Sequence, residues 1–170
     1  MLDGGRFSPG NSPGTATLNG AYTLGAGGGM EVEIADALGT AGTTTGWDLV
    51  RLLGPSGILD VQSGNTDNSR FLIHLASGNA SSPQPALNFN NASIYDWLIV
   101  DTAQGITGLD PGDIGIDASS FANPLDGGTF SVAERSGDLY LHYQPVPEPS
   151  TFALFASCVG LLGLKRRRSF

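Results

Sequence analysis

The chain has 170 residues, of which 25 are glycine and only 14% are charged, and this composition excludes a fold of long, ion-paired helices. A hydrophobic fraction of 40% excludes a disordered chain. Four of the eight basic side chains, Lys165 to Arg168, lie among the last six residues, so four basic and sixteen acidic side chains precede them. This acidic body repels phosphate backbones, which excludes nucleic acid as its partner.

Strand-like runs alternate with turn signals from residue 8 to residue 143. The SPGNSPG sequence at 8–14 is a turn cluster, and Asn19-Gly20 marks a tight turn between two short apolar runs. Further strands are expected at 30–34, 47–53, 57–61, 70–75, 95–101, 129–134 and 138–143. Short strands at this spacing, without a sustained helical period, predict an all-β body.

The MEVEI run alternates strictly between apolar and acidic residues. Met30, Val32 and Ile34 are expected to face the core, whereas Glu31 and Glu33 share the opposite face. Paired carboxylates can catalyse glycoside hydrolysis. Two carboxylates on one strand between core positions are more typical of a solvated face, and we favour that interpretation.

A second acidic cluster lies in LDPGDIGID, where Asp110, Asp113 and Asp117 are close in sequence. Several oxygen ligands in a glycine-containing loop suit calcium, but the EF-hand order of ligands is missing. The alternative is a Pro-Gly turn that enters a strand and is capped by aspartate. We favour the capped turn, and a calcium site is the alternative that stays open.

Motifs for catalysis are missing from the sequence. It contains no phosphate loop or dinucleotide fingerprint, and its single cysteine, Cys158, lies in the apolar tail. His74 and His142 alternate with apolar residues, so both are expected to point outward, which gives little support for an acid–base pair. We therefore expect a protein without enzymatic activity and without a cofactor.

Aromatic residues offer one route to a binding surface. We expect most of them to fill the core or cover a sheet edge, because aromatic side chains suit strands. The alternative is a sugar-stacking platform, in which case Trp97→Ala would abolish binding of the body to matrix polysaccharide. The residues concerned are Trp47, Tyr95, Trp97, Tyr140 and Tyr143.

The glycine-rich start of the body resembles a known repeat. Residues 4–34 contain the turn cluster, the LNGAYTLGAGG segment and MEVEI, and they resemble autotransporter-associated β-strand repeats of bacterial surface proteins. That resemblance implies a parallel β-helix, of which this body would be one end. Residues 128–143 resemble a closing hairpin. A β-sandwich-like body is the alternative architecture.

The C-terminal segment has three elements in a fixed order. Pro145, Pro147 and Pro149 favour an extended and exposed backbone. The uncharged run at 151–164 is expected to form a short hydrophobic helix of about 21 Å, at about 1.5 Å per residue. A bilayer core is about 30 Å thick. The terminal cations would hold the C-terminus on the cytoplasmic side, so we expect a transient transmembrane anchor.

This segment resembles the PEP-CTERM protein-sorting signal of bacteria that have an outer membrane. The resemblance implies recognition by an exosortase, which is an integral membrane protease or transpeptidase. It also implies a transient stay in the inner membrane before delivery to the envelope, the surface or the exopolysaccharide matrix. The residues that carry it are Val146, Pro147, Glu148, Pro149, Ser150 and Thr151 in the motif, and Lys165, Arg166, Arg167 and Arg168 in the basic cluster.

These features divide the chain into a glycine-rich body, 1–144, and a sorting tail, 145–170. Proteins with such a tail normally begin with a signal peptide, which MLDGGRFSPG does not resemble, so we expect further residues upstream. The predicted function is that of an exported structural or adhesive β-protein. Two alternatives are an exopolysaccharide-binding module and the C-terminal fragment of a polysaccharide-active β-helix enzyme.

Overall fold

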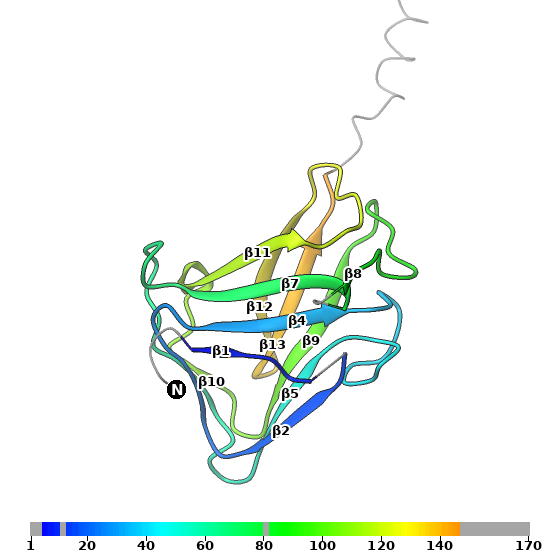
Figure 1. Cartoon of the computed structure of the whole chain (residues 1–170). Helices are drawn as coiled ribbons and strands as arrows, with labels where there is room; N and C mark the ends of the chain where they lie inside the picture. The colour runs from blue at the N-terminus through cyan, green and yellow to red at the C-terminus, as the bar shows by residue number, and fades with distance from the viewer. Residues whose placement is uncertain (1–4, 11–12, 80–81, 147–170) are drawn as a thin grey trace, which may run out of the picture.

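Three β-sheets make up the fold in the computed structural model, which describes residues 5–10, 13–79 and 82–146 (Figure 1). The first, sheet A, contains β1 (Arg6–Phe7), β4 (Gly29–Ile34), β7 (Phe71–Asn79) and β11 (Ile114–Ser120), with β8 (Ser82–Pro83) paired to β7. Sheet B contains β12 (Thr129–Arg135), β13 (Asp138–Gln144), β9 (Tyr95–Thr102), β5 (Leu49–Leu53) and β2 (Thr15–Asn19). Sheet C contains β10 (Ile106–Thr107), β6 (Leu59–Val61) and β3 (Tyr22–Leu24). The all-β prediction for the body is therefore confirmed.

The chain visits these sheets in the same order three times. β2, β3 and β4 lie in sheets B, C and A, and the same order repeats for β5, β6 and β7 and for β9, β10 and β11. Strands of successive passes pair in parallel, with β2 on β5, β5 on β9, β3 on β6, β6 on β10, β4 on β7 and β7 on β11. Parallel neighbours need a long connection between them, and the visit to the other two sheets supplies it.

Each run that the sequence predicts as a strand overlaps a strand of the structure. The last two, β12 and β13, pair antiparallel along their whole length, which confirms the predicted closing hairpin. The turn at Asn19-Gly20 is also present, but it does not join a hairpin. It forms the corner between β2 in sheet B and β3 in sheet C, and Gly20 adopts a φ of 131° there, which an L side chain rarely tolerates.

The core is apolar and rich in aromatic rings. In β4, Met30, Val32 and Ile34 are at most 1% exposed, which confirms the core positions predicted in MEVEI. The rings of Tyr95 and Trp97 stack with centroids 4.9 Å apart. Further rings packed in this region belong to Phe89, Phe121, Phe130 and Tyr143.

The burial of the aromatic residues decides between the two interpretations of them. Tyr95, Trp97 and Tyr143 are buried, so the core interpretation is confirmed for these three. Trp47 and Tyr140 are partly buried. The indole Nε1 of Trp97 donates a hydrogen bond of 3.0 Å to the carbonyl oxygen of Ala37 inside the protein. Trp97→Ala therefore tests the stability of the body. The role of Trp97 in a sugar-stacking platform was wrong, because its ring is buried.

One acidic residue departs from the predicted pattern. Glu33 is only 5% exposed, although a solvated face was expected. The segment after β4 folds back over the strand, so that the amide of Asp48 donates to the carbonyl oxygen of Glu33 at 3.0 Å. The amides of Glu33 and Gly14 donate in turn to the two carboxylate oxygens of Asp48, at 2.8 and 2.9 Å. Burial raises the pKa of Asp48 to about 7, and the nearby carboxylates of Glu33 and Glu31 add to the shift.

The described part of the fold reaches the start of the tail. β13 ends at Gln144, and Val146 is 55% exposed. Within the described residues, no helix has the length and apolar character needed to cross a membrane. The helix predicted at 151–164, the motif from Pro147 to Thr151 and the basic cluster all lie outside the described residues.

Candidate functional site

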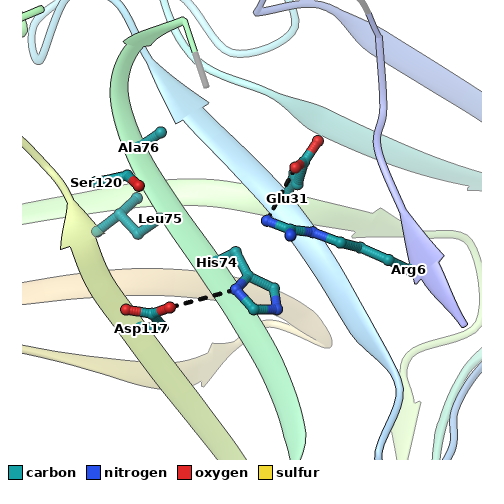
Figure 2. A pocket seen from close by; sticks show the side chains of 7 residues that line it. All are labelled: Arg6, Glu31, His74, Leu75, Ala76, Asp117 and Ser120. Carbon is teal, nitrogen blue, oxygen red and sulfur yellow. Dashed lines mark ion pairs between the residues drawn. The ribbon is translucent and has the colours of Figure 1, made fainter. Parts of the chain in front are cut away.

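A hollow of about 380 Å³ opens on the outer face of sheet A (Figure 2). We call it the sheet A groove. Four strands contribute to it, because each of β1, β4, β7 and β11 supplies one ionisable side chain. Its lining residues are Arg6, Glu31, His74, Leu75, Ala76, Asp117 and Ser120.

The parallel register explains why these charges meet. Glu31 lies opposite His74 in the pairing of β4 with β7, and His74 lies opposite Asp117 in the pairing of β7 with β11. The three residues are also equally spaced along the chain. Arg6 pairs with Gly29, two residues before Glu31, so the period of two places Arg6 on the same face. Residues far apart in sequence thus form one row across the sheet.

Two close polar contacts orient the row. Arg6 Nη2 lies 2.9 Å from Glu31 Oε1, and His74 Nδ1 lies 3.4 Å from Asp117 Oδ2. Hydrogen bonds from the side chain and amide of Ser119, together with the neighbouring His74, lower the pKa of Asp117. The groove therefore presents an ionised Asp117 and a guanidinium within one hollow.

Gly29 makes room for the histidine ring. A Cβ added at this glycine would lie 3.2 Å from His74 Nε2 and 3.1 Å from the carbonyl oxygen of Leu72. Both distances are tight for a methyl group, so a larger residue would push the imidazole away from β4. The glycine thus allows the ring to lie low over the neighbouring strand while Nδ1 faces Asp117 (Figure 2).

Both histidines point outward, as predicted, and the structure places them on different sheets. His74 lies on sheet A, and His142 lies on sheet B, where its Nδ1 is 2.7 Å from Asp96 Oδ1. Arg135 Nη2 approaches the same carboxylate oxygen at 2.6 Å. Each histidine therefore has an aspartate on the neighbouring strand, and sequence reasoning missed both of these partners.

The carboxylate pair of MEVEI is divided by the fold. Glu31 belongs to the sheet A groove and is paired with Arg6, whereas Glu33 is buried beside Asp48. The solvated-face interpretation therefore holds for Glu31 in part and fails for Glu33. Sequence reasoning also missed Arg6 as a partner of Glu31, because β1 contains only two residues and carries no detectable alternation.

The aspartates of LDPGDIGID have separate local roles. Asp110 caps the short 3₁₀ helix η1 (Pro111–Asp113) and accepts a hydrogen bond of 2.9 Å from the amide of Gly112. Asp113 ends that helix, whereas Asp117 lies in β11 and faces His74. The capped-turn interpretation is confirmed. Among the described residues, no group of three or more His, Cys, Asp or Glu side chains is arranged to hold a metal ion.

Comparison with known proteins identifies the tail. Residues 145–169 match the PEP-CTERM protein-sorting motif, which confirms the resemblance stated for the C-terminal segment. This match supports sorting of the protein to the cell surface by an exosortase. No curated protein matches the chain. The resemblance of residues 4–34 to autotransporter-associated β-strand repeats stays a prediction.

Proposed function

We propose that this chain is an exported structural or adhesive protein without catalytic activity, whose body is the end of a parallel β-helix and whose tail is an exosortase substrate. The observation that carries the proposal is the order of its parts. A body built from repeated passes ends at Gln144, and the sorting motif follows at 145–169. The body would present a surface, and the tail would deliver that surface to the envelope.

The β-helix part of the proposal is supported by the path of the chain. Three passes through sheets B, C and A, each paired in parallel with the next, are typical of a solenoid in which every coil contacts its neighbours. The antiparallel hairpin of β12 and β13 follows the last pass and extends sheet B. Terminal units of repeat proteins commonly differ from the others in this way.

The sorting part of the proposal is supported by the physical character of each tail element. Pro147, Glu148 and Pro149 supply an extended substrate with one negative charge. The apolar run at 151–164 would hold that substrate at a fixed depth in the inner membrane, beside a membrane-bound enzyme. The basic cluster would stop transfer. The mature body would then reside in the envelope, on the surface or in the exopolysaccharide matrix.

Replacing Glu148 with alanine should block processing and keep the protein in the inner membrane. The change removes the single charge of the motif and leaves the body untouched. The whole chain is expressed behind a signal peptide in a host that has an exosortase, and its distribution between membrane and surface fractions is measured. Glu134→Ala, which removes one exposed carboxylate from β12, is the matched control and should be sorted like the wild type. Equal sorting of Glu148→Ala and wild type would contradict the proposal.

Replacing Lys165, Arg166, Arg167 and Arg168 together with serine should have a different effect. Each of these charges opposes entry into the bilayer centre by about 2.5–3.5 kcal/mol, so their loss should let the tail slip through or invert. A protease added to spheroplasts, whose outer membrane has been opened, then reports which side of the inner membrane carries the C-terminus. A variant with the wild-type orientation would show that the basic cluster does not set the topology.

A further inference from the structure

The sheet A groove calls for an explanation beyond folding. Ion pairs exposed on a protein surface contribute little to stability, yet four strands align Arg6, Glu31, His74 and Asp117 in one row. The row lines a hollow of about 380 Å³, within the range of about 300–1,000 Å³ that is typical of ligand sites. In such sites, a small number of precisely placed polar groups fixes the orientation of the ligand.

We propose that the sheet A groove binds a neutral, hydroxyl-rich glycan. The inference goes beyond sorting and does not depend on it, because the groove lies wholly within the body. It would give the exported body a specific contact with the carbohydrate that surrounds a bacterial cell.

The donors and acceptors of the groove fit hydroxyl groups. Glu31 and Asp117 offer carboxylate oxygens that accept from sugar hydroxyls, and the guanidinium of Arg6 donates to hydroxyl oxygens. Its side chain is 51% exposed, so it remains accessible while it is paired with Glu31. Nδ1 of His74 faces Asp117 at 3.4 Å, so Nε2 takes no part in that contact and can meet a ligand. Ser120 adds a hydroxyl at the rim.

The charges of the groove select against the other ligand classes. Two carboxylates face one guanidinium, and the whole body is acidic, so uronate, sulfate and phosphate polymers would be repelled. Within the described part of the chain, no group of side chains is arranged to hold a metal ion, which disfavours a bare divalent cation. The lining contains no Phe, Tyr or Trp side chain for stacking. Recognition would therefore rest on hydrogen bonds, and we expect it to be weak for a single short glycan.

The test is isothermal titration of the purified whole chain with four neutral tetrasaccharides, namely cellotetraose, xylotetraose, mannotetraose and maltotetraose. At least one should bind, and tetragalacturonate should bind more weakly. Glu31→Gln and Asp117→Asn each remove a charged acceptor and should weaken binding about tenfold or more. Asp96→Asn is the matched control, because Asp96 also pairs with a histidine on an outer face but lies on sheet B. It should retain the wild-type affinity.

Three results would overturn the proposal. The first is the absence of binding by all four neutral tetrasaccharides, and the second is tighter binding of tetragalacturonate. The third is an equal loss of affinity in Asp96→Asn and Asp117→Asn. Thermal unfolding of each variant shows whether a loss of binding reflects a loss of folding, and Ser120→Ala provides a milder change in the rim if a carboxylate variant unfolds.

Discussion

Replacing Trp97 with alanine is expected to lower the free energy of unfolding by about 3–5 kcal/mol, the usual cost of removing a large buried aromatic side chain. The side chain is 1% exposed, stacks on Tyr95 with an interplanar angle of 5°, and donates a hydrogen bond to Ala37. Its loss would leave a cavity and a buried carbonyl oxygen without its donor. Both effects lower the free energy of unfolding.

Chemical denaturation of the whole chain measures this loss, with tryptophan fluorescence as the probe. The sequence has two tryptophans, so Trp47 reports on unfolding in the Trp97 variants. Trp47→Phe, in which Trp97 alone reports, serves as a reference. Trp97→Phe keeps an apolar ring but loses the indole donor, and it should fall between wild type and Trp97→Ala. A loss below about 1 kcal/mol for Trp97→Ala would contradict a packed aromatic core, because buried large-to-small changes cost more than this.

The stability of the body is expected to fall as the pH rises from about 4 to about 7. The folded pKa of Asp48 is raised from 3.8 to about 7, so the folded state holds this proton more tightly than the unfolded state does. Below the pKa of the unfolded state, Asp48 is protonated in both states, and its contribution to the stability of the folded state is fully present. As the pH rises between these two pKa values, the free energy of unfolding falls by about 1.4 kcal/mol per unit of pKa difference. The loss is complete above about pH 7.

Urea denaturation at pH 5 and pH 8 tests this expectation. The wild type should unfold at a lower urea concentration at pH 8. Asp48→Asn cannot ionise, so it should show a smaller difference between the two pH values. Its amide nitrogen cannot accept a hydrogen bond, so the amide of Gly14 or of Glu33 loses its acceptor, and the variant should be less stable than wild type at pH 5. Asp67→Asn, at a side chain that is 97% exposed, should keep the wild-type difference. A body that gains stability from pH 5 to pH 8 would show that Asp48 does not control this window.

The strands were predictable because each one carries its own evidence. In β4 and β13 the apolar residues recur with a period of two, and a glycine-containing turn precedes each strand, so these segments could be placed from local sequence alone. The hairpin of β12 and β13 was predictable for the same reason, since its turn at Ser136-Gly137 is short and local. The outward direction of His74 and His142 followed from the same alternation.

The pairing of distant strands was not predictable from these patterns. Alternation determines which face a residue occupies, but it does not determine which other strand lies alongside. The sheet A groove depends on four strands in parallel register, so its members could not be grouped before the fold was known. The equal spacing of Glu31, His74 and Asp117 was the one available signal. The burial of Glu33 was missed because it depends on a connecting segment that folds back over β4.

The sorting tail, unlike the groove, was predictable from the sequence, because it is defined by the order of its elements along the chain. Proline-flanked Glu148, an uncharged run and a basic cluster can be identified without knowledge of any contact, and the match at 145–169 agrees with that identification. We therefore expect this tail, which follows the β body directly in the sequence, to be the substrate of a sorting enzyme.

Mass spectrometry of the C-terminal peptide tests this expectation. The whole chain is expressed behind a signal peptide in a host with an exosortase and recovered from both the surface and the inner-membrane fractions, and the mass of its C-terminal peptide is determined in each. The wild type should end near Pro147-Glu148-Pro149 and lack Phe170, whereas Glu148→Ala should retain it. An intact Phe170 in both proteins, with both held in the inner membrane, would show that the tail is an anchor and contradict the account.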